Sequence, residues 1–196
     1  NTGLYYHGYD ESRRSIWCDT KTGLSKNFWL RSIGWFILSL VDTALAIDES
    51  LYYEFRRLQE MLYNLANDLL KFQDESGMFY QLVDRKDDKD NYLETSGSAL
   101  ISYAFLKAAR NKLLPKRFED IGKKIFDGIL DRYLCVEGEE LSLGGICLVS
   151  GLGGKENRDG SAEYYYSEPV VKNEAKGVAP LLMAYTEIIR LDMTYD

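Results

Sequence analysis

Three side chains near the start of one hydrophobic segment have types that suit sugar binding. The segment KNFWLRSIGWFILSLVDTALA, residues 26–46, contains Trp29, Arg31 and Trp35. A guanidinium can bind a carboxylate through two parallel hydrogen bonds, and an indole ring suits the apolar face of a sugar. Because Arg31 and Trp35 are one helical turn apart, we expect both to point at the same spot. Together they predict a site for an acidic sugar.

A structural role for the same residues remains open. Arg31 could instead pair with Asp10 or Asp19, and Trp35 could fill the core. His7, in the segment YYHGYDES, is the chain's one histidine. It could donate a hydrogen bond to a sugar hydroxyl, orient a water molecule, or serve a structural purpose.

Carboxylates follow the histidine closely in sequence. Asp10, Glu11 and Asp19 are the nearest of them. Two carboxyl groups can act as acid and base in glycoside cleavage. Their spacing selects no pair, and surface or capping roles account for them more simply.

Composition and charge narrow the classes of function. The chain has 196 residues, enough for one domain with a core, and is 45% hydrophobic and 28% charged. Its formal net charge is −7 and its Lys and Arg are scattered, which argues against nucleic-acid binding. Aromatic residues make up 13%, with 15 Tyr, which suits stacking on sugar rings or an aromatic core.

The cysteines give neither a disulfide framework nor a metal site. Cys18, Cys135 and Cys147 are odd in number, and their spacing fits no zinc site, so we expect a reducing compartment. No apolar run reaches transmembrane length, and no signal peptide opens the chain. The chain begins at Asn1 rather than Met, which suggests a fragment or a processed product.

Hydrophobic spacing predicts the elements that would position these side chains. Five long helices are expected, at residues 30–46, 51–72 after a Ser50 cap, about 95–110, a segment after Pro115, and about 175–191. Short links predict that the first four form two antiparallel hairpins. The glycine-rich polar stretch 151–169 predicts a long functional loop, and it does not match a phosphate-binding loop.

The segments that precede the helices repeat. GLYYHGYD (residues 3–10) resembles GMFYQLVD (77–84), and helices then open near a glycine in RSIG (31–34), ETSG (94–97) and EAKG (174–177). This repeat predicts an all-α toroid of helical hairpins with short β-like segments in the loops between hairpins. About three inner helices make only half of such a ring. The open half would expose apolar faces.

Taken together, these motifs resemble those of the unsaturated rhamnogalacturonyl hydrolases. GLYYHGYDESRRSIWCDTKTGLSKNFWLRSIGW, residues 3–35, is similar to that family's G-L-x-x-H-G-[WY]-D, W-[AS]-D and F-W-x-R-x-x-G-W motifs. RDGSAEYYYSEPVVKNEAKGVAPLLMAY, residues 158–185, is similar to its C-terminal end. The resemblance covers nearly the whole chain in the family's order. The related unsaturated glucuronyl hydrolases share the fold but match these motifs less well.

The resemblance implies a fold, a location and a reaction. The fold would be a six-hairpin α/α barrel, cytoplasmic, without metal or organic cofactor, with residues 1–196 as a single domain forming its C-terminal half. The substrate would be a pectin oligosaccharide ending in a uronic acid with a C4=C5 double bond. An aspartic acid would protonate this vinyl ether, water would add at C5, and the product would open and release the sugar. His7, Trp29, Arg31 and Trp35 fall on substrate-binding positions of the family.

The chain departs from the family pattern in three respects. Leu30 replaces the glycine that is common between Trp and Arg, and Cys18 stands where a small residue is usual, so both would reshape the pocket. The family's aspartic acid lies N-terminal to the histidine motif, in a part of the barrel that this chain does not contain. No catalytic residue is therefore assigned, and whether this chain is an enzyme by itself is left open.

Two classes of function follow. The chain is either half of a glycoside hydrolase, or a truncated, non-catalytic helical-hairpin protein that binds acidic sugars or a protein partner. The first predicts a longer parent chain or a partner that carries the other hairpins. The second predicts a stable species that forms a homo-oligomer to bury its open edge. Neither class involves nucleic acid or a membrane.

Overall fold

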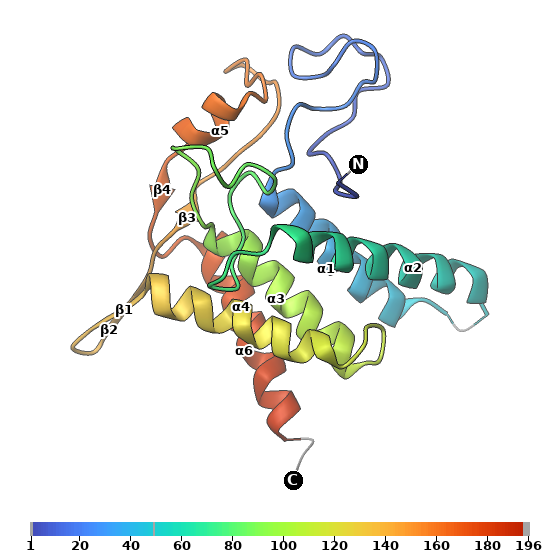
Figure 1. Cartoon of the computed structure of the whole chain (residues 1–196), viewed down its shortest axis with the longest axis vertical. Helices are drawn as coiled ribbons and strands as arrows, with labels where there is room; N and C mark the ends of the chain where they lie inside the picture. Colours follow the sequence, from blue (N-terminus) through green and yellow to red (C-terminus); the bar gives the residue numbers. More distant parts are fainter. Residues whose placement is uncertain (1, 49, 194–196) are drawn as a thin grey trace.

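Helices make up most of the structure, a computed structural model that describes residues 2–48 and 50–193 (Figure 1). The helices are α1 (Leu30–Ala46), α2 (Tyr52–Leu69), α3 (Thr95–Arg110), α4 (Arg117–Tyr133), α5 (Ala162–Ser167) and α6 (Ala175–Asp192). A 3-10 turn, Leu70–Phe72, follows α2. Two antiparallel strand pairs lie between α4 and α6: β1 (Leu134–Glu137) with β2 (Glu140–Leu143), and β3 (Ile146–Cys147) with β4 (Val170–Val171).

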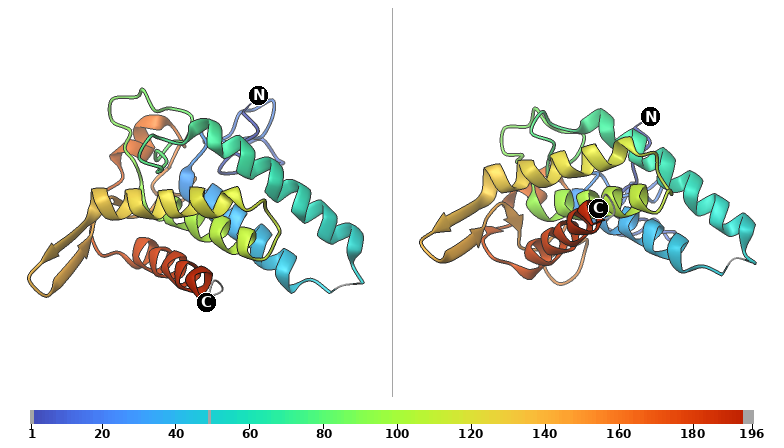
Figure 2. Two further views of the ribbon diagram at one scale, coloured as in Figure 1. Left: turned by 60° about the horizontal axis from the view of Figure 1, so that its bottom comes forward. Right: turned by 90° about the horizontal axis from the view of Figure 1, so that it is seen from below.

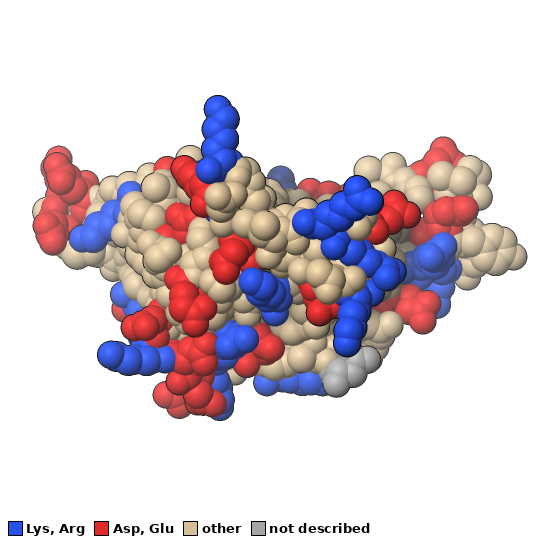
Figure 3. Space-filling view, turned by 90° about the horizontal axis from the view of Figure 1, so that it is seen from above, with Lys and Arg blue, Asp and Glu red and all other residues tan. Residues whose placement is uncertain are grey.

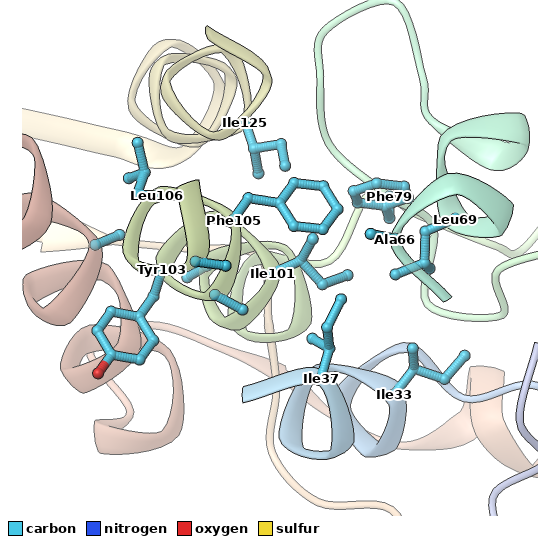
Figure 4. Close-up of a cluster of buried hydrophobic side chains, with 14 of the residues drawn as sticks. Ile33, Ile37, Ala66, Leu69, Phe79, Ile101, Tyr103, Phe105, Leu106 and Ile125 are labelled. Carbon is cyan, nitrogen blue, oxygen red and sulfur yellow. The ribbon is translucent and has the colours of Figure 1, made fainter. Parts of the chain in front are cut away.

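Helix α3 lies at the centre, in contact with α1, α4 and α6 (Figure 1). Every residue from Thr95 to Leu106 is buried. Side chains from three other helices and one loop meet α3 in the core, and Figure 4 labels several of them: Ile33, Ile37, Ala66, Leu69, Phe79 and Ile125. Helix α3 is rich in Ser, Gly and Ala because a helix surrounded by others needs small side chains at its contacts.

The glycines at the helix openings allow α1 and α3 to approach closely. A Cβ on Gly97 would lie 2.4 Å from Cγ of Leu30 and 3.0 Å from the backbone carbonyl carbon of Leu30. A Cβ on Gly34 would lie 2.9 Å from Cβ of Leu100 and 3.2 Å from the carbonyl oxygen of Gly97. Gly34 and Gly97 are therefore required for the close packing of α1 against α3.

We expect Gly97→Ala to lower the free energy of unfolding by about 1–2 kcal/mol. Overpacking a core costs typically about 1–3 kcal/mol, while alanine in place of glycine in a helix returns about 0.5–1 kcal/mol. Urea denaturation measures the difference. Gly144→Ala is the matched control, because its Cβ would meet nothing closer than 3.6 Å. Equal stability of both variants and the wild type would contradict the close α1–α3 contact.

Most of the predicted helices are confirmed, with two differences. Ser50 does not cap α2: the residue at the N-cap is Leu51, without a side-chain hydrogen bond, and the Ser50 amide donates to Oδ1 of Asp48 instead. The predicted loop 151–169 contains the short helix α5, which begins after Ser161, whose hydroxyl accepts from the Tyr164 amide (3.1 Å). A helix this short leaves too little periodic pattern to be predicted.

The all-α hairpin arrangement agrees with the predicted fold class. Helices α1 and α2 form one hairpin, α3 and α4 the next, and α6 lies at the edge of the helix layer (Figure 2). One side of α6 and the residue that follows it carry exposed apolar side chains at helical spacing: Leu182, Tyr185, Ile189 and, just after the helix, Met193. This α6 stripe is the apolar face that a half-ring was predicted to leave open. None of the helices in the described part of the chain is long and apolar enough to cross a membrane.

Candidate functional site

Arg31 lies in a buried ion pair that joins three elements. Its Nε donates to Oγ of Ser96 (2.6 Å), and its Nη2 donates to Oε1 of Glu94 (3.5 Å) and to the carbonyl oxygen of Cys147. Glu94 is fully buried and also accepts from the amides of Gly97 (2.7 Å) and Cys147 (3.0 Å). The pair therefore fastens α1 to the start of α3 and to β3.

The expectation that Arg31 and Trp35 point at one spot is wrong for this structure. Arg31 is 2% exposed, while Trp35, one turn further along α1, is 48% exposed. The expected alternative partners, Asp10 and Asp19, are wrong as well, since the partner is Glu94. Arg31 and Trp35 lie on the same side of α1. The start of α3 and β3 cover Arg31, in the first turn of the helix, and leave Trp35 exposed.

His7, Trp29 and Tyr165 form an aromatic cluster between the N-terminal segment and α5. The rings of His7 and Trp29 are 4.6 Å apart between centroids, and Nδ1 of His7 lies 2.6 Å from the Tyr165 hydroxyl. Trp29 packs against Leu82 and Tyr165, and its Nε1 donates to Oε1 of Gln81 (3.2 Å). The structure thus brings His7 and Trp29 together, as their motif positions predicted.

Burial keeps the His7–Tyr165 pair uncharged. Desolvation lowers the pKa of His7 to about 4, so its imidazole is neutral at pH 7. Desolvation also raises the pKa of Tyr165 well above its usual range, so its hydroxyl keeps its proton. At neutral pH this cluster therefore offers hydrogen bonds rather than charge.

His7 also lines a small cavity at the start of α1. The cavity has a volume of about 240 Å³, and its other lining residues are Tyr5, Tyr6, Ser32, Ile33 and Phe36. Tyr5 and Tyr6 are partly exposed and rest on Phe36 and Phe28, with ring centroids 4.6 and 4.3 Å apart. Flat apolar rings beside an imidazole and two hydroxyl-bearing side-chain types are chemically suited to a sugar ring.

The carboxylates after His7 organise loops. Asp10 accepts hydrogen bonds from the Ser12 hydroxyl (2.7 Å) and from the amides of Ser12 (2.9 Å), Arg14 (3.0 Å) and Ser15 (2.9 Å), and those bonds, above all that from the Ser12 hydroxyl, hold its pKa well below the usual range. Asp19 accepts from the amides of Lys21 and Thr22, and its pKa is lowered for the same reason. Neither group suits a proton donor near pH 7.

Two further features of the surface are a larger hollow and a mixture of charges. A larger hollow of about 1010 Å³ lies between α2 and the turn after α3, with Arg56, Tyr63 and Lys112 on its wall, and shares no lining residue with the His7 cavity. Positive and negative side chains are mixed over the face shown in Figure 3. Among the residues that the structure describes, no three His, Cys, Asp or Glu side chains gather to hold a metal ion.

Two residues of the site were missed by the sequence analysis. Glu94 belongs to the repeated helix opening ETSG, a pattern that predicts the repeat but not the ion pair. Tyr165 lies in a stretch expected to be a loop, and its burial follows from α5, which positions it against His7. The polar residue at each repeated helix opening was the available signal for Glu94.

Sequence relatives agree with the motifs. Residues 1–192 match the sequence model of Glycosyl Hydrolase Family 88. The chain is 39% identical over 197 residues to a 24.9 kDa protein in the picA locus of Rhizobium radiobacter, covering 96% of this chain and 83% of that protein. It is 32% identical over 109 residues to the unsaturated rhamnogalacturonyl hydrolase YesR of Bacillus subtilis, covering 56% of this chain and 28% of YesR.

Solved structures agree with the fold. The chain superposes on a family 105 glycoside hydrolase of C. acetobutylicum with a TM-score of 0.92 and 41% identity, over 95% of this chain and 52% of that one. The unsaturated glucuronyl hydrolase of Bacillus sp. GL1 shares the fold, with a TM-score of 0.60 at 18% identity. The chain spans about half the length of these structures. The family resemblance of its motifs is thereby confirmed, and the chain belongs to Glycosyl Hydrolase Family 88.

Proposed function

We propose that the chain forms the C-terminal half of a hydrolase for pectin oligosaccharides that end in an unsaturated uronic acid. In this proposal residues 1–196 are one domain, and the reaction hydrates the C4=C5 double bond. The observation that carries it is the aromatic surface beside His7, on the segment with the family's motifs. The name of the B. subtilis relative, an unsaturated rhamnogalacturonyl hydrolase, supports the substrate class.

Each predicted binding residue has its own part in this proposal. Trp35, which is half-exposed, stacks on the sugar, and His7 forms a hydrogen bond to it. Trp29 supports the imidazole from inside the cluster. Arg31 lies behind Trp29, with its guanidinium carbon 5.4 Å from the ring centroid, and stiffens the site from within.

The proposed reaction also needs a carboxylic acid that exchanges a proton near pH 7. The lowered pKa values of Asp10 and Asp19 argue against both. We therefore propose that the acid belongs to the hairpins that complete the barrel. Protonation of the double bond and addition of water call for no metal or organic cofactor.

The same hairpins are the partner that we propose for the α6 stripe. The solved family 105 chain is about twice as long as this one, and the α6 stripe is exposed. A set of helical hairpins, supplied by a longer parent chain or a separate one, would cover it. A second copy of this chain covering the stripe is the alternative, and mass measurement in solution would identify it. We propose a cytoplasmic location because the three cysteines are free thiols.

Trp35→Ala is the direct test of sugar binding. We expect it to weaken binding of unsaturated rhamnogalacturonan disaccharide about 5- to 30-fold, since losing one stacked ring costs about 1–2 kcal/mol. Stability should change little, because the side chain is half-exposed. Calorimetric titration of the purified chain measures the affinity. Arg31→Ala is the poorer test, since it also leaves Glu94 buried without its cation.

A matched control separates the site from the rest of the surface. Tyr53 on α2 is 82% exposed, and Tyr53→Ala should leave the affinity unchanged. Catalysis is then tested by following the ultraviolet absorbance of the substrate's double bond. The measurement is made with the chain alone and with the N-terminal hairpins added. Binding without catalysis in either case would indicate the non-catalytic class, and unchanged binding in Trp35→Ala would contradict the proposed site.

A further inference from the structure

The hydrogen bond between His7 and Tyr165 joins two segments that are far apart in sequence. Nδ1 of His7 and the Tyr165 hydroxyl are 2.6 Å apart, across 158 residues of chain. Tyr165 is fully buried on α5, and Trp29 lies against both rings. The imidazole therefore has one nitrogen committed to the protein, and Nε2 is the nitrogen left for another partner.

The direction of this hydrogen bond follows from what each group needs. Among the described residues, the Tyr165 hydroxyl has no hydrogen-bond partner besides His7. If Nδ1–H donated to the hydroxyl oxygen, the Tyr165 O–H would be a buried donor without an acceptor, which costs about 1–3 kcal/mol. If the hydroxyl donates instead, Nδ1 accepts through its lone pair and both groups are satisfied.

We propose that Tyr165 is a positioning residue that fixes His7 as the tautomer with its hydrogen on Nε2. His7 then presents a hydrogen-bond donor, and not a base, to the cavity that it lines with Tyr5, Tyr6 and Ser32. A ligand oxygen, such as a sugar hydroxyl or the oxygen of a bound water, is what this donor recognises. The assignment of a sugar as that ligand rests on the proposed function, while the tautomer does not.

The fold supports this assignment on both sides of the pair. The Ser161 hydroxyl accepts from the Tyr164 amide and begins α5, which orients the next residue toward His7. The His7 amide donates to the carbonyl oxygen of Asn27 (3.4 Å), which restrains the N-terminal segment against the start of α1. Hydrogen bonds to the backbone therefore hold both α5 and the His7 segment in place.

Nitrogen-15 NMR of the imidazole tests the proposal directly, because His7 is the chain's one histidine and gives one pair of ring signals. At pH 7 we expect Nδ1 to have the chemical shift of an unprotonated, hydrogen-bonded nitrogen, and Nε2 that of a protonated one. In Tyr165→Phe the Nδ1 signal should move to higher frequency, since its lone pair loses the donor. Tyr166→Phe is the matched control: its hydroxyl donates to Asp88 (2.8 Å), and the His7 signals should not move.

Two results would overturn the proposal: a protonated Nδ1 in the unaltered protein, or an unchanged Nδ1 signal in Tyr165→Phe. The first needs no variant, so it decides the tautomer even if Tyr165→Phe folds poorly. Adding unsaturated rhamnogalacturonan disaccharide tests the sugar separately. A fixed tautomer whose Nε2 signal ignores the sugar would refute the proposed ligand of His7 and leave the role of Tyr165 standing.

Discussion

Glu94→Gln is expected to lower the free energy of unfolding by about 3–5 kcal/mol, the usual cost of removing one partner of a buried ion pair. Glu94 is fully buried and Arg31 is 2% exposed. The carboxylate accepts hydrogen bonds from Arg31, Ser96, Gly97 and Cys147. An amide keeps the size but lacks the charge and half of the acceptor capacity, so the guanidinium is left buried without its anion.

Urea denaturation of the unaltered protein, Glu94→Gln and Glu174→Gln measures this effect. Glu174 is the matched control, because it occupies the same place in the repeat EAKG as Glu94 does in ETSG. Its side chain is 28% exposed and pairs with Lys176 at the surface, so Glu174→Gln should cost less than about 1 kcal/mol. Equal losses in the two variants would show that the buried pair does not hold α1 to α3.

The second large effect is a loss of stability in mild acid caused by His7. The ordinary pKa of this side chain is 6.5, and burial lowers it to about 4 in the folded protein. Between these values the unfolded chain binds more protons, so the free energy of unfolding rises with pH. His7 does not reduce the free energy of unfolding above about pH 6.5. As the pH drops from there to about 4, the free energy of unfolding falls by up to about 3 kcal/mol. Below that pH both states carry the charge and this group adds no further change.

Denaturation curves at a series of pH values between 4 and 7 measure this loss. Carboxylates with lowered pKa, such as Asp10 and Asp19, lose their contribution only below about pH 4, so their effect falls outside the window. His7→Gln keeps a neutral polar side chain and should flatten the curve between pH 6.5 and 4. A variant whose stability falls as steeply as that of the unaltered protein would rule out His7 as the cause.

The fold could be predicted where hydrophobic spacing runs over several turns. The bounds of α1 and α3 are the predicted ones, and their hairpin partners follow from short links. The cap of α2 and the helix α5 were missed, since each depends on a few local hydrogen bonds. The repeated glycine was noticed in sequence, yet its reason, the approach of Leu30 to Gly97, needed the packed helices.

The contacts among the candidate site residues could be predicted only in part. His7 and Trp29 lie together, as expected of two separate motifs that the family resemblance places at one pocket. The partner of Arg31 is 63 residues away, and the partner of His7 is 158 residues away. Nothing in local sequence selects Glu94 over nearer carboxylates, because the choice depends on which inner helix begins beside α1.

The central place of α3 has a consequence for the order of events during protein synthesis. Helix α3 is complete at Arg110, whereas α6, which packs against it, begins only at Ala175. At roughly 5–20 residues per second, translation of the intervening segment takes on the order of several seconds. For that interval α6 does not yet cover its side of α3. The nascent protein must therefore keep this apolar surface from aggregating until α6 has emerged from the ribosome.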